Sequence, residues 1–234
     1  MTWTRPACVL ALNLAIGALA LATAQPPARP KEATKPDSTK TAAQAEKAAQ
    51  ERARKIVDER KAMIGRPAPE FYPSATINAR NQRLADFRGK VVLLNFWTVG
   101  SSPSLTMLPF LKELSTKYKE RGLEVIGLTG YVKNRDFKDG SIITSPVNLT
   151  PPQEQDMLRR LAAHLQLKYR LALLNDDVRK DTFSEYKVGD LPHFVIIDRY
   201  GVLRLMRIGE GSENARVIEA ELQKVLDEPH TAIK

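Results

Sequence analysis

Residues 89–114 change from an apolar strand pattern to a helical pattern, and this change sets the architecture of the chain. The apolar run contains Val91, Val92, Leu93, Leu94, Phe96 and Trp97. A near-continuous run of this kind is typical of a strand that is buried on both faces of a mostly parallel sheet. Because such a strand needs a covering layer on each side, the pattern predicts an α/β fold with this strand at the centre of the sheet.

The turn after this strand contains residue types that begin a helix. Ser101 is of an N-cap type, and Pro103 fits a first helical turn because its missing N–H has no helical partner there. The residues expected on the sheet side of the helix recur at spacings of four, three and four: Met107, Leu111, Leu114 and Tyr118. Pro109 falls inside this pattern, so the helix is expected to kink.

Four segments carry a resemblance to a known family. Residues 95–109, NFWTVGSSPSLTMLP, resemble position for position the NFWATWCPPCRAEMP-type segment of TlpA/ResA-like thiol-disulfide oxidoreductases, which are exported members of the thioredoxin superfamily. Residues 65–71 and 84–92 resemble the entry to that family's domain. Residues 189–192 resemble its cis-proline loop, with Pro192 as the proline.

The resemblance implies an α/β, thioredoxin-like fold over residues 64–228, with a central mixed sheet, flanking helices and an inserted loop-helix-strand. Periodicity and cap residues lead to the same order of elements. Strands are expected at 123–129, 169–174, 193–198 and 201–208, and helices at 150–167, 176–186 and from 212 onward. We expect strand 169–174 at a sheet edge, and Thr150 and Ser212 as helix caps.

Serines occupy the two positions that carry the redox cysteines in the resembled family, Ser101 and Ser104. Disulfide exchange needs a thiolate as nucleophile and a second sulfur to resolve the mixed disulfide, and a hydroxyl supplies neither. The single cysteine, Cys8, lies in the segment that we interpret as a leader. We therefore predict neither thioredoxin nor peroxiredoxin chemistry for the mature chain, and no catalytic residue.

The resemblance also implies a groove between the Ser101 turn and the loop that contains Pro192. Our hypothesis is that this groove binds an extended peptide or protein partner through backbone hydrogen bonds. The candidate binding residues are Trp97, Ser101, Ser104, Leu191, Pro192 and His193.

Other chemistry at this site finds little support in the sequence. A nucleophilic Ser101 would need an oriented base, only His193 of the three histidines could approach it, and no G-x-S-x-G elbow is present. We interpret the serines as caps, His193 as the start of a strand and Trp97 as a core residue. No metal site and no cofactor are predicted, because histidines are scarce and no calcium-loop spacing occurs.

The N-terminal part of the chain is interpreted as export and linker sequence. Residues 1–24 have the basic start, apolar run and Ala-Thr-Ala end of a secretory signal peptide, with an uncleaved membrane anchor as the alternative. Residues 25–63 comprise a Pro- and Lys-rich tether followed by a solvated helix from residue 41. Residues 229–234 form a C-terminal tail. We therefore expect a periplasmic or other extracytoplasmic location, with membrane tethering if the leader is retained.

The charge balance is basic, with 36 Lys and Arg against 27 Asp and Glu and a net charge of +9. A basic balance favours anionic surfaces such as the cell envelope, which is a second candidate partner. No nucleic-acid motif is present. Residues 130–150 lack clear periodicity and follow a parallel strand at the edge where α/β sheets bind ligands, so they form either a recognition loop or a solvated insertion with a short hairpin.

Three functional interpretations remain open at this point. The favoured one is an exported, redox-inactive thioredoxin-like domain that binds peptides or proteins. The second is a TlpA/ResA-like thiol-disulfide oxidoreductase whose cysteines were engineered to serine. Val99 and Gly100 argue against it, because they also depart from the family's Thr-Trp, and engineering would change only the thiols. The third is a basic structural protein of the cell envelope.

Overall fold

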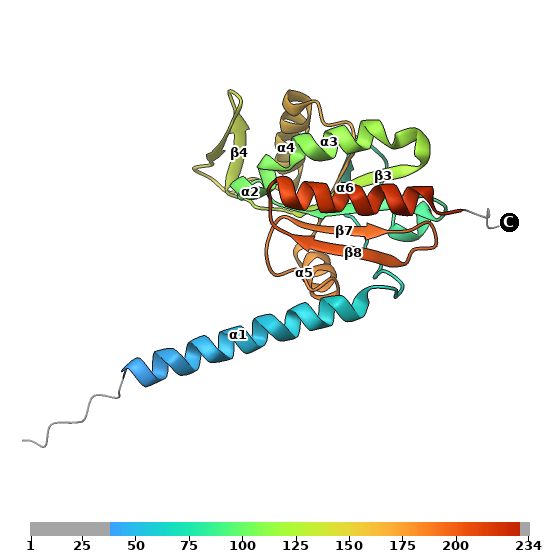
Figure 1. Ribbon diagram of the computed structural model, residues 1–234. Coiled ribbons are helices and arrows are strands. Elements are labelled where there is room, and N and C mark those ends of the chain that lie inside the picture. Colours follow the sequence, from blue (N-terminus) through green and yellow to red (C-terminus); the bar gives the residue numbers. More distant parts are fainter. Residues whose placement is uncertain (1–37, 230–234) are drawn as a thin grey trace, which may run out of the picture. The chain divides into compact units, whose positions relative to one another are not determined.

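Residues 38–229 are described by the computed structural model of the chain (Figure 1). The chain divides into two compact units, residues 1–44 and 45–234. Of the first unit, only the helical residues 38–44 are described. The expected signal peptide and most of the tether lie outside the described residues, as does the tail beyond residue 229. Within the described part, no helix combines the length and apolarity needed to cross a bilayer.

Six strands form one mixed sheet in the order β1-β6-β3-β2-β7-β8. They are β1 (Ala75–Ile77), β2 (Val91–Phe96), β3 (Leu123–Gly130), β6 (Arg170–Leu174), β7 (His193–Ile197) and β8 (Leu203–Ile208). Strand β2 pairs in parallel with β3 and antiparallel with β7. The apolar run therefore forms an interior strand, as its composition predicts.

Side chains of β2 alternate between two apolar cores, one on each face of the sheet. Val91 and Leu93 belong to the core under α3 (Leu108–Lys117), α4 (Pro151–Leu165) and α6 (Ser212–Asp227). Val92, Leu94 and Phe96 belong to the opposite core, under α5 (Asp176–Glu185) and the 3-10 helix η1 (Leu84–Phe87). Burying each of these side chains contributes about 1.5–3 kcal/mol, so this strand is a principal source of stability.

Strand β6 does not lie at the sheet edge, contrary to the sequence-based expectation for residues 169–174. It pairs in parallel with β3 on one side and antiparallel with β1 on the other. Strand β1 has three residues, too few for an alternating pattern to be recognised, and the Ser74 N–H extends its pairing by donating to Leu173 O at 2.8 Å. This short strand takes the edge position that β6 was expected to occupy.

The helix after β2 is interrupted where its proline predicts a kink. It consists of α2 (Ser102–Thr106) and α3, joined at Met107. Pro109 lies in the first turn of α3, where its missing N–H costs no hydrogen bond. A further 3-10 turn, η2 (Lys119–Arg121), leads into β3.

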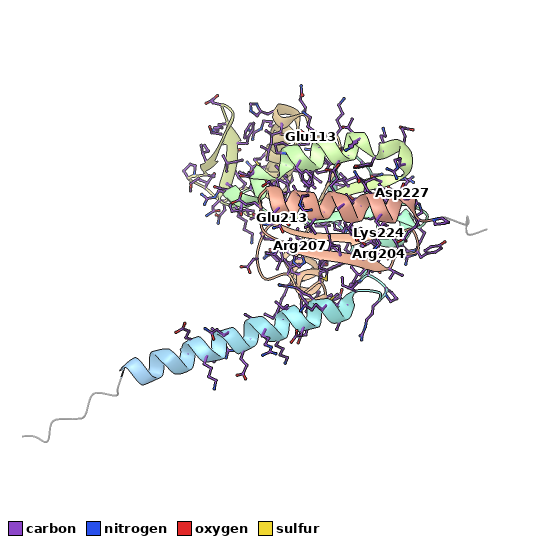
Figure 2. The ribbon with its side chains drawn as sticks, viewed as in Figure 1. Glu113, Arg204, Arg207, Glu213, Lys224 and Asp227 are labelled. Carbon is purple, nitrogen blue, oxygen red and sulfur yellow. The ribbon has the colours of Figure 1, made fainter. Side chains whose placement is uncertain are left out.

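Of the two helix caps expected from the sequence, one is confirmed and one is wrong. Thr150 caps α4, with its N–H donating to Gln153 Oε1 at 2.8 Å in a reciprocal capping box. Ser212 is not a cap but the first residue of α6, and Gly211 is the N-cap with φ 103°. Glycine adopts this positive φ without a steric penalty, whereas a serine would adopt it only at a cost in free energy. The charged residues Glu213, Lys224 and Asp227 project from the exposed face of α6 (Figure 2).

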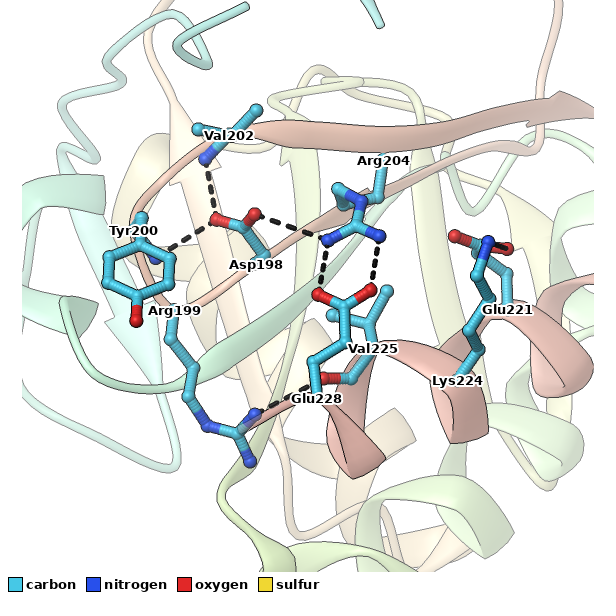
Figure 3. Close-up of polar contacts among 9 residues, drawn as sticks. All are labelled: Asp198, Arg199, Tyr200, Val202, Arg204, Glu221, Lys224, Val225 and Glu228. Carbon is cyan, nitrogen blue, oxygen red and sulfur yellow. Dashed lines mark hydrogen bonds and ion pairs between the residues drawn. The ribbon is translucent and has the colours of Figure 1, made fainter. Parts of the chain in front are cut away.

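An ion-pair cluster holds the end of α6 against β8 (Figure 3). Both terminal nitrogens of Arg204 donate to the Glu228 carboxylate, at 2.6 and 2.5 Å, and Arg204 also pairs with Asp198 at 3.4 Å. This hydrogen bonding lowers the pKa of Glu228. The bidentate geometry fixes residue 228, just beyond α6, to the sheet.

Helix α1 (Ser38–Met63) begins three residues earlier than expected and is only partly solvated. Residues 45–58 are exposed, whereas Arg60 and Met63 are half-buried. The Arg60 Nε and Nη2 groups donate to Lys187 O at 2.9 and 2.6 Å, and Met63 packs against the core that contains Phe96. The last turns of this helix are therefore part of the folded domain.

The segment 130–150 contains a hairpin of β4 (Arg135–Lys138) and β5 (Ser141–Thr144). Its turn is made by Asp139 and Gly140, both with positive φ. The hairpin is separate from the central sheet and is drawn beside α2 and α4 in Figure 1. Strand β4 contacts α4, and Phe137 is buried in the core on that side.

Candidate functional site

The Ser101 turn and the loop with Pro192 leave the sheet at the same edge. Phe96, the last residue of β2, pairs with His193, the first residue of β7. The chain after Phe96 and the chain before His193 therefore extend from neighbouring strands in the same direction. The Leu191-Pro192 peptide bond is cis, as the resemblance implies for this loop.

Ser101 is the N-cap of α2. Its Oγ accepts the N–H of Ser104 at 3.4 Å, and its carbonyl accepts the N–H of Leu105 at 3.1 Å. Among the described residues, no histidine is hydrogen-bonded to the Ser101 hydroxyl. The Ser101 hydroxyl is thus a helix cap, as interpreted, and lacks the base that a nucleophilic serine needs. Ser102 and Ser104 lie within α2 and are not caps, contrary to that interpretation.

His193 is fully buried at the start of β7, where the sequence interpretation puts it. Neither ring nitrogen has a hydrogen-bond partner within the described residues. Burial, together with the nearby Arg60 charge, lowers the pKa of His193 to about 3. The ring is therefore neutral at ordinary pH and packs against Phe96, with ring centroids 5.8 Å apart.

The six candidate binding residues divide into buried and accessible ones. Trp97, Ser104, Pro192 and His193 are buried, and Ser101 and Leu191 are half-buried. Trp97 is a core residue whose indole lies over β3, where a Cβ at Gly127 would come within 2.9 Å of Trp97 Nε1. Of the six, only Ser101 and Leu191 have accessible side chains at this edge, because the other four are buried beneath it.

Replacing Ser104 with alanine is expected to raise the free energy of unfolding by about 1 kcal/mol. Ser104 is 0 % exposed and its Oγ has no hydrogen-bond partner in the described part of the chain. Burying an unpaired hydroxyl costs about 1–3 kcal/mol, which alanine avoids while leaving a small cavity. Urea unfolding measures the change.

The matched control is Ser102→Ala in the same helical turn. Ser102 is exposed, so its substitution should change stability by no more than about 0.5 kcal/mol. A Ser104→Ala variant less stable than Ser102→Ala would mean that the buried hydroxyl is satisfied in solution.

A cavity of about 540 Å³ lies beside the Ser101 turn, between the β4–β5 hairpin, α2 and α4. Its lining includes Gly100 and Ser102 from the turn and Arg135 and Ile142 from the hairpin. The sequence indicated that segment 130–150 could be a recognition loop, but it contained no signal for this cavity. The lining residues become neighbours only when the hairpin folds back on α4.

A metal-binding cluster of three or more His, Cys, Asp or Glu is absent from the described residues. The single cysteine of the sequence, Cys8, lies outside them.

Comparisons with known proteins agree with the resemblance seen in the sequence. The chain is 28 % identical over 170 residues to the thiol-disulfide oxidoreductase ResA of Bacillus anthracis, covering 73 % of this chain and 83 % of that protein. For ResA of Geobacillus kaustophilus, the identity is 26 % over 162 residues, with 69 % and 78 % covered.

Solved structures establish the fold at lower identity. A putative thiol:disulfide interchange protein DsbE from Chlorobium tepidum superposes with a TM-score of 0.53 at 21 % identity, covering 70 % of this chain and 97 % of that one. A putative protein disulfide isomerase from Bacteroides thetaiotaomicron also gives 0.53 at 21 % identity, with 70 % and 91 % covered. These likenesses agree with the expected thioredoxin-like fold, a mixed sheet flanked by helices.

The family itself is identified by a match that spans most of the folded domain. Residues 64–206 match the AhpC/TSA family, which is more than half of the chain. The matched range contains the Ser101 turn and the Pro192 loop. The chain therefore belongs to the AhpC/TSA family and is a TlpA/ResA-like redoxin, with Ser101 and Ser104 at the positions that the sequence resemblance assigns to the redox cysteines.

Proposed function

We propose that this redoxin does not exchange thiols and disulfides and instead binds an extended polypeptide at the Ser101 turn and the Leu191–Pro192 loop. The observation that carries the proposal is the serine pair at the start of α2. Ser101 Oγ accepts a backbone N–H and the Ser104 hydroxyl is buried. A hydroxyl at either position cannot replace the thiolate or the resolving sulfur that the exchange requires.

Binding without catalysis is supported by the backbone at the Leu191–Pro192 loop. Pro192 O accepts the N–H of Gly209 at 2.9 Å, and Arg60 holds Lys187 O from the other side. Between these two anchor points, Leu191 makes no backbone hydrogen bond within the described residues, and its side chain is half-buried. A free backbone pair on a fixed loop is suited to an extended chain, which supplies its own N–H and C=O groups.

The N-terminal sequence pattern favours a setting outside the cytoplasm, in which such binding is useful. Residues 9–22 form an apolar run interrupted by Asn13 and ending in the Ala-Thr-Ala at 22–24, which is the pattern of a secretory leader. We propose that the chain acts outside the cytoplasm on extended segments of other exported proteins. The net charge of +9 favours acidic partners over basic ones.

The full chain should reduce insulin with dithiothreitol no faster than dithiothreitol does alone, because it offers no thiolate at the site. It should also bind reduced, carboxamidomethylated α-lactalbumin, an unfolded polypeptide without free thiols. In NMR spectra of the labelled chain, this probe is expected to shift the amide signals of Ser101, Ser102 and Leu191. Both measurements use the same preparation of the protein.

The matched variants for binding are Leu191→Ala and Val147→Ala, which remove apolar side chains inside and outside the proposed groove. Only Leu191→Ala should weaken binding, by about threefold to tenfold for a partly buried apolar contact. Two results would contradict the proposal. One is insulin turnover above background that persists in Ser101→Ala, and the other is a set of NMR amide shifts that does not include residue 191.

A further inference from the structure

The cavity beside the Ser101 turn has a guanidinium group at its rim. Arg135 lies next to Gly100, where an added Cβ would be 3.8 Å from Arg135 Nε. This guanidinium is therefore adjacent to the turn that begins at Ser101. Gly100 and Ser102 line the cavity, so the cavity adjoins the same turn that forms one side of the proposed groove.

The Arg135 charge has no carboxylate partner. Its Nη1 donates to the Thr144 hydroxyl across the hairpin, and no Asp or Glu pairs with it among the described residues. Nearby cations differ, because Arg160 pairs with Asp136 and Asp156, and Lys133 pairs with Asp176. An unneutralised guanidinium at the mouth of a cavity favours an anionic group on the ligand, and a carboxylate fits it in two parallel hydrogen bonds.

The cavity has both polar and apolar walls, with Ser102, Ser141, Thr144 and His164 among the polar contributors. Val99, Leu105, Phe137, Ile142 and Leu161 contribute to its lining. Ile142 and Leu105 are only partly buried, so their accessible surface faces this space. A volume of about 540 Å³ holds one large aliphatic or aromatic side chain with room for the adjoining backbone.

We propose that this cavity binds a large apolar side chain of the extended polypeptide, while Arg135 pairs with the carboxylate of an adjacent Asp or Glu side chain. The inference rests on the proposed function and specifies the partner, which is an acidic extended segment with an apolar residue next to a carboxylate. An internal acidic side chain is chosen over a chain terminus because the segment continues from the cavity along the Ser101 turn to Leu191. The net charge of +9 is complementary to such a partner.

Three acetylated and amidated octapeptides, with Leu-Glu, Leu-Gln or Ala-Glu at the centre and Gly and Ser elsewhere, test the inference by NMR titration of the full chain. The Leu-Glu peptide should shift the amide signals of Gly100, Arg135 and Ile142. Replacing Glu by Gln should weaken binding by about fivefold to tenfold, since one charge-assisted pair is lost. Replacing Leu by Ala should weaken it by a similar factor.

Matched variants distinguish binding in the cavity from non-specific effects of the protein's charge and apolar surface. Arg135→Gln should abolish the preference for Glu over Gln, whereas Arg159→Gln, on the exposed face of α4 and outside the cavity lining, should keep it. Ile142→Ala should reduce the preference for Leu over Ala, whereas Ile143→Ala, its exposed neighbour in β5, should not.

The outcomes distinguish the two proposals. If the Leu191 amide signal shifts and all three peptides bind with equal affinity, the proposed role of the cavity is wrong and the proposed groove is retained. If the amide signals of Arg135 and Ile142 shift and that of Leu191 does not, the proposed groove is wrong and the cavity is an isolated carboxylate site. If none of the peptides shifts any signal, both are wrong for this class of partner. Equal effects of Arg135→Gln and Arg159→Gln would overturn the ion pair.

Discussion

The double variant Ser101→Cys/Ser104→Cys is expected to reduce insulin disulfides, although the parent chain does so only at background. Residue 101 is half-buried and residue 104 is fully buried, so the thiol introduced at position 101 would attack the substrate and the thiol at position 104 would resolve the mixed disulfide. The two residues are close, because the N–H of residue 104 already donates to the side chain of residue 101 at 3.4 Å. The same N–H would stabilise a thiolate at position 101.

The size of the gain follows from the thiolate fraction. A pKa lowered from about 8.5 to about 7, as at other C-x-x-C sites, raises the thiolate fraction at pH 7 from about 3 % to about 50 %. Turnover in the presence of dithiothreitol should therefore exceed that of an equal concentration of free cysteine by on the order of tenfold. A stopped insulin assay with thiol titration measures both the rate and the disulfide content.

Single variants provide the controls for this prediction. Ser101→Cys alone should form a mixed disulfide that is not resolved, because the described residues offer no second thiol. Ser104→Cys alone should react slowly with iodoacetamide, because that site is buried. A double variant that forms no internal disulfide would mean that the family alignment of these two positions is wrong.

The fold could be predicted from the sequence wherever the pattern was long. The run at Val91 to Trp97 was enough to identify an interior strand, and Pro109 marked the break between α2 and α3. Two features were missed for different reasons. Strand β1 is too short to show a period, and Arg60 binds a carbonyl 127 residues away.

The candidate site could be predicted in part. The serine turn and the Pro192 loop were located from local motifs, because the residues that determine a strand–turn–helix transition are adjacent in the sequence. The burial of His193 and the cavity under the hairpin were not predicted. Both depend on how side chains from β4, α4 and α1 pack, and no periodicity in one segment encodes those contacts.

The folded chain should lose about 2 kcal/mol of stability between pH 7 and pH 5 through His193 alone. Its pKa is lowered from 6.5 to about 3 in the folded state, chiefly by burial. Below pH 6.5 the unfolded chain takes up a proton that the folded chain refuses, so stability falls as pH decreases toward 3. Over the 1.5 pH units below 6.5 the loss is about 1.36 kcal/mol per unit.

Urea unfolding of the parent and of His193→Leu at both pH values isolates this effect. Other groups also titrate: hydrogen bonds from Arg160 and Arg204 lower the pKa of Asp136 and Glu228, and burial raises that of Glu154. These groups are common to both proteins and cancel in the difference. The free energy of unfolding of His193→Leu minus that of the parent should be about 2 kcal/mol larger at pH 5 than at pH 7.

A difference between parent and His193→Leu that does not vary with pH would mean that water or a rearranged partner reaches the His193 ring. Because His193 directly follows Pro192 and pairs with Phe96, its protonation would act on both sides of the proposed groove. Acid should therefore weaken polypeptide binding by the folded chain only near pH 3, where the folded-state His193 ring takes up its proton, and in His193→Leu this loss should be absent.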